Sequence, residues 1–147
     1  IAAMSDFLSL SPTYGVAPQT TIEDVAAAKA QGFAMVVNNR PDGEEPSAPQ
    51  GDDIAHAAAA EGLAYAAIPI GHSGFSHAQI DALDTLLADA TGPILAYCRS
   101  GTRSTHLWAL TQARGGADVD AIVDAAAKAG YDLTGLRPML DALAGEK

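Results

Sequence analysis

Three short segments of the chain are almost entirely apolar. They are the runs FAMVVN, LAYAAIPI and ILAY at residues 33–38, 63–70 and 94–97. Apolar runs of strand length without polar alternation are typical of strands that are buried on both faces of a parallel sheet. An earlier segment, residues 7–16, contains Pro12 and Gly15. We expect this segment to form an edge strand, where a proline costs no ladder hydrogen bond.

Segments with helical spacing separate these runs and fill most of the C-terminal third. The starts of the first three helices are marked by candidate capping residues, which are Thr20, Asp52 or Asp53, and Ser76. The later helical stretch has breaks at Gly115–Gly116 and Gly130, and Pro138 fits a first turn. Strands that alternate with helices form a parallel sheet covered on both faces. The sequence therefore predicts a three-layer α/β fold with a mainly parallel central sheet of four or five strands.

The composition and charge exclude several classes of function. The chain has 147 residues, with 18 Asp and Glu against 8 Lys and Arg, so its formal net charge is -10 at pH 7. This balance leaves no basic surface for nucleic acid or anionic lipid, and we expect neither partner. The hydrophobic fraction of 48% is enough for a packed core. We expect a single domain over residues 4–147.

The chain contains one cysteine, Cys98. It can form no intrachain disulfide and no cysteine-rich zinc site, and it fits a reducing compartment. No apolar stretch approaches the roughly 18 residues of a membrane span, so we expect a cytoplasmic protein. Ile1, Ala2 and Ala3 precede Met4. We interpret these three residues as an expression remnant, although a processed terminus would look the same.

The segment CRSGTRS at residues 98–104 is the best candidate for a functional site. It lies between the last apolar run and a helix, and ligands of open α/β sheets bind at this carboxyl end of the strands. A glycine-containing turn before a helix directs backbone N–H groups inward and forms an anion site. Those N–H groups and the nearby arginines favour the thiolate form of Cys98, which makes it nucleophilic. The alternative is a buried, inert cysteine at the end of a core strand.

The other residues of this segment have separate expected roles. The planar guanidinium of Arg103 can bind two oxygens of a tetrahedral oxyanion. Gly101 permits a positive φ or a close approach of the ligand. Ser104, expected at the N-cap of the following helix, can donate to the sulfur or assist a leaving thiolate. Arg99 either positions the ligand or points to solvent, while its backbone N–H lines the anion site together with those of Ser100 and Thr102.

This segment, with Leu107–Trp108 after it, resembles the bacterial beta-lactamase-hydrolase-like phosphatase family, which is distantly related to dual-specificity protein phosphatases. Further segments that carry the resemblance are APQ at 17–19, VNNRPDGEE at 37–45, IPI at 68–70 and AGYDL at 129–133. The resemblance implies a dual-specificity-phosphatase-like fold. It also implies that Cys98 is the nucleophile, that Arg103 binds the anion, and that the backbone from Arg99 to Thr102 holds the oxyanion.

Two departures from the pattern of cysteine phosphatases keep a second chemistry open. Those enzymes carry His before the cysteine and five residues between cysteine and arginine, whereas here Tyr97 precedes Cys98 and four residues separate it from Arg103. The shorter loop also resembles that of rhodanese-type sulfurtransferases. Phosphatases use an aspartic acid after the strand that corresponds to residues 63–70, but this chain has Gly71-His72-Ser73 there.

Several polar residues outside the loop are weaker candidates. His72 can replace the missing general acid, although an exposed loop histidine is the slightly favoured interpretation. Asp42 is either an unconventional acid or part of a solvated turn. Arg40 either helps to bind an anion or pairs with Glu44. The remaining histidines lack metal-ligand spacing, so we expect no metal and no other cofactor; they are His56, His77 and His106.

Three functions are compatible with this sequence. The first is a phosphatase-like hydrolase that acts on a small oxyanion or phosphorylated substrate through a covalent Cys98 intermediate. The second is a rhodanese-like sulfurtransferase that passes sulfane sulfur from a thiosulfate or persulfide donor to an acceptor thiol. The third is a redox or anion sensor whose cysteine is oxidised rather than turned over. Overall likeness favours the first function, whereas the loop length and the missing aspartic acid favour the second.

Overall fold

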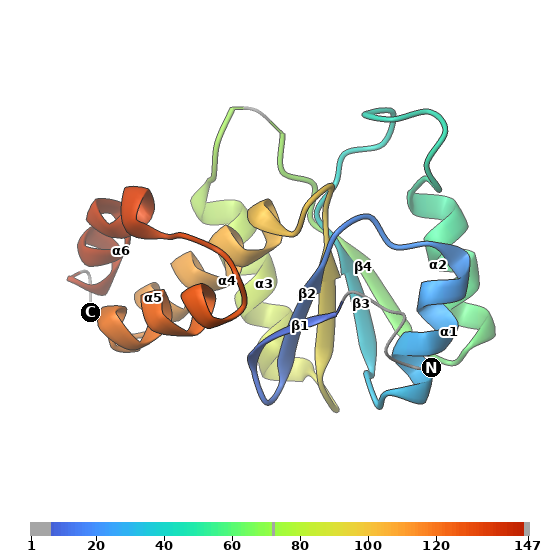
Figure 1. The fold of residues 1–147 in the computed structure, drawn as a ribbon, viewed down its shortest axis with the longest axis horizontal. Helices are drawn as coiled ribbons and strands as arrows, with labels where there is room; N and C mark the ends of the chain where they lie inside the picture. Colours follow the sequence, from blue (N-terminus) through green and yellow to red (C-terminus); the bar gives the residue numbers. More distant parts are fainter. Residues whose placement is uncertain (1–6, 72, 146–147) are drawn as a thin grey trace.

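A five-stranded sheet forms the centre of the structure, a computed structural model that describes residues 7–71 and 73–145. Its strands lie in the spatial order β1, β2, β5, β3, β4 (Figure 1). Their bounds are Leu8–Ser11 for β1, Tyr14–Ala17 for β2, Ile94–Tyr97 for β5, Met35–Asn38 for β3 and Ala64–Ala67 for β4. Only the β1 and β2 pair is antiparallel. The mainly parallel sheet is therefore confirmed, while residues 1–4 and His72 lie outside the described residues.

The N-terminal segment forms a hairpin rather than one edge strand. β1 is the edge strand, and β2 lies between β1 and β5 with all four of its residues buried. The prediction was wrong because Pro12 belongs to the turn between the two strands, so it interrupts no ladder. Gly15 belongs to this inner strand. The position favours glycine because a Cβ atom there would lie 2.9 Å from the ring of Phe33.

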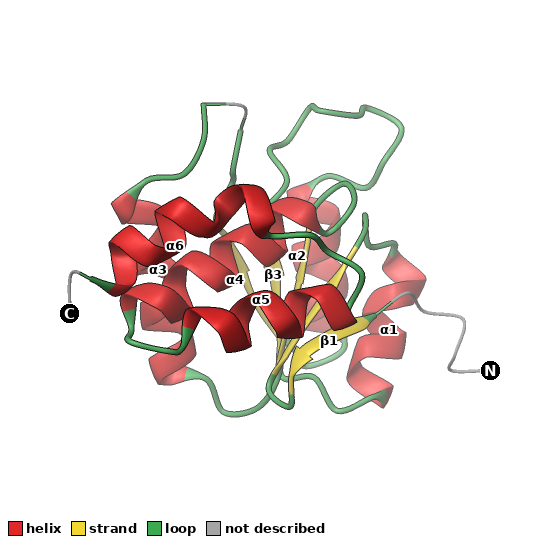
Figure 2. Cartoon of the chain, turned by 60° about the vertical axis from the view of Figure 1, so that its left-hand side comes forward, coloured by secondary structure: helices red, strands yellow, loops and turns green. Residues whose placement is uncertain are grey.

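Helices cover both faces of the sheet. On one face lie α1 (Ile22–Ala30) and α2 (Gly51–Ala60), and on the other lie α3 (His77–Asp89) and α4 (Thr102–Arg114) (Figure 1). Outside α4 pack α5 (Val119–Lys128), the short 3-10 helix η2 (Thr134–Leu136) and α6 (Arg137–Ala144) (Figure 2). Among the described residues, none of these helices has both the length and the hydropathy to cross a membrane.

The helix starts differ from the predicted ones at three places. Thr21, not Thr20, caps α1, because Thr20 is buried while the Thr21 hydroxyl accepts the N–H of Asp24 at 3.1 Å. The N-cap of α2 is Gln50, whose N–H donates to Asp53 at 2.9 Å. α4 starts before Ser104, with Gly101 as N-cap. The predicted cap at Ser76 and Pro138 in the first turn of α6 are confirmed.

Two clusters of buried apolar side chains pack against opposite faces of the sheet. The larger cluster lies between one face of the sheet and the helices α3, α4, α5 and α6. It includes the fully buried Leu107 and Leu110 and the stacked pair Tyr14 and Trp108. The smaller one joins α1 and α2 with the other face, where small residues such as Ala28 and Ala58 are completely buried. Burial on both faces holds the carboxyl ends of β2, β5, β3 and β4 at one edge of the sheet.

Candidate active site

Cys98 lies directly after β5, at the carboxyl edge of the sheet. Its backbone N–H bonds to the carbonyl of Ala17 at 3.4 Å, which keeps the residue in line with the inner strands. The side chain is completely buried. Its Sγ accepts a hydrogen bond from the backbone N–H of Gly101 at 3.1 Å. The chain therefore turns back over the sulfur within three residues, as the sequence predicts for an anion site.

Gly101 makes this turn possible. Its φ of +90° is in the left-handed region, and a Cβ atom there would come within 2.1 Å of the Tyr131 hydroxyl. As the N-cap of α4, Gly101 also offers its carbonyl to Thr105, which bonds it through both N–H (2.9 Å) and Oγ1 (2.8 Å). The N-terminus of a thirteen-residue helix thus adjoins Cys98, and its dipole favours negative charge there.

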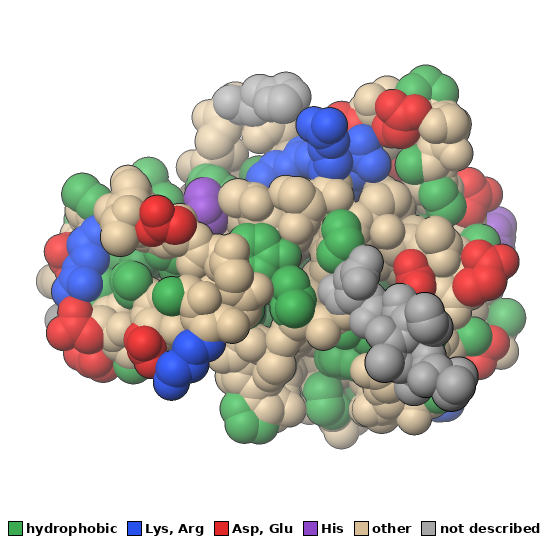
Figure 3. Space-filling model, viewed as in Figure 1, with side chains coloured by type: hydrophobic (Ala, Val, Ile, Leu, Met, Phe, Trp, Pro, Cys, Tyr) green, Lys and Arg blue, Asp and Glu red, His purple; other side chains and the backbone are tan. Residues whose placement is uncertain are grey.

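Two of the three residues between Cys98 and α4 face the solvent, whereas Gly101 is buried. Arg99 and Ser100 are exposed, and the hydroxyl groups of Ser100 and Thr102 bond to each other at 2.9 Å. The Arg99 carbonyl accepts the N–H of Gln19 at 3.2 Å. Figure 3 shows basic side chains gathered in a hollow between two protruding loops, above the carboxyl edge of the sheet. This local positive charge contrasts with the formal net charge of -10.

Glu44 connects two arginines at this edge. The guanidinium of Arg103 binds the two Glu44 carboxylate oxygens at 2.6 and 2.8 Å and the carbonyl of Ile70 at 2.8 Å. Arg40 donates from Nε to Glu44 at 2.8 Å and from its NH1 group to Gln19 at 3.0 Å. Of the two roles considered for Arg40, the structure therefore shows the ion pair. The Glu44 carboxylate thus accepts a hydrogen bond from each of the two terminal guanidinium nitrogens of Arg103.

The two arginines control the protonation of Glu44. The hydrogen bond from Arg103, supported by Arg40 and by the charges of both, lowers the pKa of Glu44 to about 2, although burial acts in the opposite direction. The pKa of Arg103 is raised, mainly by its hydrogen bond to Glu44 and also by Cys98. Glu44 is therefore ionised at neutral pH and cannot donate a proton to a leaving group.

Ser104 does not have the role that the sequence predicts. It lies inside the first turn of α4, fully buried, and its hydroxyl donates to Asn39 Oδ1 at 2.7 Å. A serine hydroxyl has one proton, so this bond commits it to Asn39 rather than to the sulfur. Asn39 also donates from Nδ2 to the carbonyl of Ile68 at 2.9 Å. Sequence reasoning missed Asn39, although a polar pair directly after an apolar strand was a usable signal.

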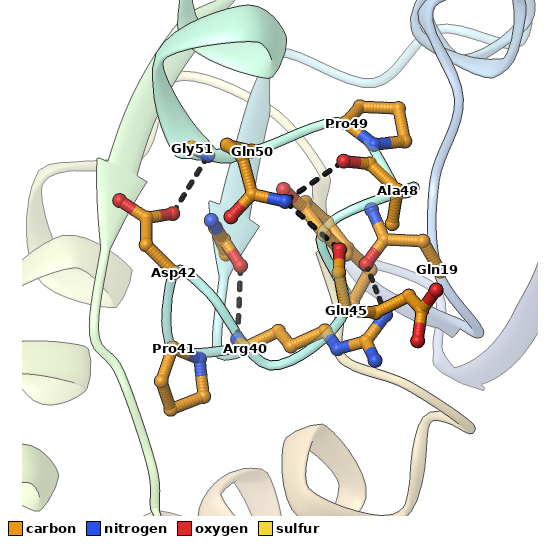
Figure 4. A pocket seen from close by; sticks show the side chains of 11 residues that line it. Gln19, Arg40, Pro41, Asp42, Glu45, Ala48, Pro49, Gln50 and Gly51 are labelled. Carbon is orange, nitrogen blue, oxygen red and sulfur yellow. Dashed lines mark hydrogen bonds between the residues drawn. The ribbon is translucent and has the colours of Figure 1, made fainter.

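The candidate acids lie elsewhere or outside the described part. Asp42 Oδ1 accepts the N–H of Gly51 at 2.8 Å and lines a small polar pocket (Figure 4). The volume of this pocket, about 10 Å³, suits one water molecule rather than a substrate. Tyr97, the residue in place of the phosphatase histidine, also lines it, and burial raises the pKa of its hydroxyl. His72 follows Ile70 by two positions but lies outside the described residues.

The other histidines are not near Cys98 in any described contact. His56 and His77 are exposed. His106 is half-buried on α4. The centroid of its ring lies 5.9 Å from that of Phe75, and desolvation lowers the pKa of His106. Across residues 7–71 and 73–145, no group of three or more His, Cys, Asp or Glu side chains could hold a metal ion.

Comparison with known proteins identifies similar chains. Residues 6–117 match the family model described as "Beta-lactamase hydrolase-like protein, phosphatase-like domain". A beta-lactamase hydrolase-like protein of Agrobacterium fabrum is 40% identical over 101 residues, a match that covers 69% of this chain and 23% of that protein. This chain thus spans about a quarter of the length of that relative.

Solved structures show the same fold. A proposed phosphatase from Neisseria meningitidis has 31% sequence identity and a TM-score of 0.83, over 94% of this chain and 98% of that one. The kinase associated phosphatase, solved with its catalytic-site cysteine replaced by serine, has 17% identity and a TM-score of 0.70, over 95% of this chain and 93% of that one. The second likeness is one of fold alone.

Proposed function

Because this chain belongs to the family of the beta-lactamase hydrolase-like protein, phosphatase-like domain, we propose that it is a cysteine-dependent hydrolase of phosphomonoesters. Its substrates would be phosphotyrosine-type or small phosphate esters. The observation that carries the proposal is the turn at Cys98, where the Gly101 N–H bonds the sulfur and α4 begins. The thiolate is the form of cysteine that attacks phosphorus, and a backbone N–H donor and a helix N-terminus both favour negative charge on an adjoining atom.

The proposed reaction has two steps. The Cys98 thiolate attacks phosphorus, the bond from phosphorus to the ester oxygen breaks, and a phosphocysteine forms while the alcohol leaves with a proton. Water then attacks phosphorus, which releases inorganic phosphate and restores the thiolate. The N–H groups of residues 99–102 and the guanidinium of Arg103 would stabilise the charge on the equatorial oxygens in both steps.

The leaving group decides which esters react well. Glu44 is ionised at neutral pH, and the loop from Gly71 to Ser76 contains no aspartic acid. His72 remains the proposed proton donor, whereas Asp42 accepts the N–H of Gly51 in the separate small pocket. With a weak general acid, aryl phosphates should react faster than alkyl phosphates, because a phenolate leaves without full protonation.

One observation favours a sulfurtransferase as the second candidate. Four residues separate Cys98 from Arg103, and this tighter ring suits a persulfide sulfur better than a phosphoryl group. In that reaction the Cys98 thiolate attacks the sulfane sulfur of thiosulfate, the S–S bond breaks and sulfite leaves. An acceptor thiolate or cyanide then takes the sulfane sulfur and restores the Cys98 thiolate. No general acid is needed.

One pair of assays separates the two candidates. The protein and its Cys98→Ser variant would be given p-nitrophenyl phosphate and, separately, thiosulfate with cyanide. We expect phosphate release by the parent protein and a loss of at least about 1000-fold in Cys98→Ser, whose folding is checked by circular dichroism. Turnover of thiosulfate alone would exclude the phosphatase, and unchanged activity in Cys98→Ser would exclude both mechanisms.

A further inference from the structure

The peptide bond between Ser100 and Gly101 is hydrogen-bonded at both ends. Its N–H donates to Cys98 Sγ at 3.1 Å, and its C=O accepts from the hydroxyl of Tyr131 at 3.0 Å. A trans peptide is planar, and its N–H and C=O point in opposite directions. Two partners on opposite sides therefore fix one orientation of this peptide, with the N–H toward the sulfur.

Tyr131 is itself held firmly. Its backbone N–H bonds to the carbonyl of Ala126 at 2.8 Å, at the end of α5. Two residues later, Leu133 is almost fully buried in the larger core cluster. Between them, the Asp132 carboxylate accepts the N–H and the hydroxyl of Thr134 at 2.9 and 2.8 Å. The phenol is thus presented to the Cys98 loop by a well-anchored segment.

The close approach of the two segments requires glycine. A Cβ atom at position 101 would lie 2.1 Å from the Tyr131 hydroxyl and 3.0 Å from its ring. Burial and the nearby Cys98 raise the pKa of Tyr131, so its hydroxyl keeps the donated proton at neutral pH.

We propose that Tyr131 is a positioning residue that holds the Ser100–Gly101 peptide with its N–H on Cys98, and so favours the thiolate. Without the hydroxyl, this peptide can rotate and turn its carbonyl oxygen toward the sulfur. The partial negative charge of that oxygen would then repel the thiolate. The proposal rests on the proposed function only in that the reactive form of Cys98 is the thiolate. It adds a residue that touches neither substrate nor sulfur.

The test measures ionisation of the thiol rather than turnover. Because Cys98 is the one cysteine, the ultraviolet absorbance of its thiolate can be followed against pH with Cys98→Ser as the blank. Tyr131→Phe, blanked with its own Cys98→Ser double variant, should move the midpoint up by about one pH unit, since a charge-assisted hydrogen bond is weakened. Turnover of p-nitrophenyl phosphate should fall by up to about 10-fold at pH values below the parental midpoint, where the thiolate fraction changes most, and by much less well above the midpoint of the variant.

The matched control is Tyr14→Phe. Tyr14 is fully buried at the amino end of β2, the opposite end of the sheet from Cys98, and its loss of a hydroxyl should leave the midpoint unchanged. A Tyr131→Phe variant that is less stable but keeps the parental midpoint would overturn the positioning role alone. A parent protein that forms no thiolate at neutral pH would overturn the proposed nucleophile as well.

Discussion

At the scale of single residues, Glu44 controls the charge that a ligand meets. Its carboxylate takes two N–H groups of Arg103, and the Ile70 carbonyl takes a third. These three hydrogen bonds fix the orientation of the Arg103 guanidinium, and a group that is already oriented loses less entropy when it binds a ligand. They also place a negative charge beside the site where an oxyanion would bind, and like charges weaken that binding. In the proposed function, Glu44 would therefore both orient Arg103 and compete with the oxyanion.

Removal of the Glu44 charge should strengthen oxyanion binding. Glu44→Gln keeps an oxygen for Arg103 and deletes the repulsion, so inorganic phosphate should bind about 5-fold more tightly by calorimetry. Glu45→Gln is the control, because Glu45 is exposed in the same loop and bonds to Ser47 rather than to Arg103. Weaker phosphate binding in Glu44→Gln would mean that orientation of Arg103 outweighs the competing charge.

At the scale of elements, one buried amide joins two strands and a helix. Asn39, at the end of β3, bonds the Ile68 carbonyl after β4 and the Ser104 hydroxyl in α4. The backbone N–H of Asn39 also bonds the carbonyl of Tyr97 at the end of β5. The loop that carries Cys98 is therefore fixed relative to its neighbours by hydrogen bonds as well as by the apolar clusters.

The side chain of Asn39 should be energetically coupled to Ser104. Asn39→Ala leaves buried polar groups without partners, and we expect it to lower the free energy of unfolding by about 2–3 kcal/mol. The double-mutant cycle with Ser104→Ala should give a coupling energy of about 1 kcal/mol or more. Urea unfolding can be followed by the fluorescence of Trp108, which is buried in the core. Additive effects of the two substitutions would contradict this link.

At the scale of the whole molecule, acidic residues outnumber basic ones, and the fold strongly lowers the pKa of one of them. Glu44 is among 18 acidic residues, and its pKa lies at about 2 in the fold against an ordinary value of 4.5. A carboxyl whose pKa is lowered by folding stabilises the native state above its unfolded pKa. That contribution is lost as the pH falls toward the folded value.

Acid should therefore remove the stability that Glu44 provides. At neutral pH we expect the parent protein to exceed Glu44→Gln by about 1–2 kcal/mol in free energy of unfolding, allowing for partial solvent screening. The difference should shrink as the pH falls from about 4.5 to about 2. Urea titrations at several pH values measure it, with the exposed Glu61→Gln as control. A difference that does not change with pH would contradict this assignment.

Features that a few neighbouring residues encode could be predicted without the structure. Apolar runs identified β3, β4 and β5, and the pattern at Ser76 located the start of α3, because periodicity and capping act over one or two turns. The glycine turn after Cys98 was also predictable, because a glycine between a strand and a helix is a local signal. Local information has a limit at the first helix. Its cap was predicted one residue too early, because the burial of Thr20 depends on the rest of the fold.

The tertiary structure alone decided which distant side chains meet at Cys98. Tyr131 bonds the carbonyl of Ser100 across 31 positions, and Glu44 reaches Arg103 across 59. Arg40 and Arg103 share one carboxylate, and Asn39 accepts the hydrogen bond of the Ser104 hydroxyl, according to how the elements pack on the sheet. Such contacts depend on helix and strand placement to within an ångström. The apolar pattern of each helix or strand does not specify that placement, because the placement results from side-chain packing between the elements.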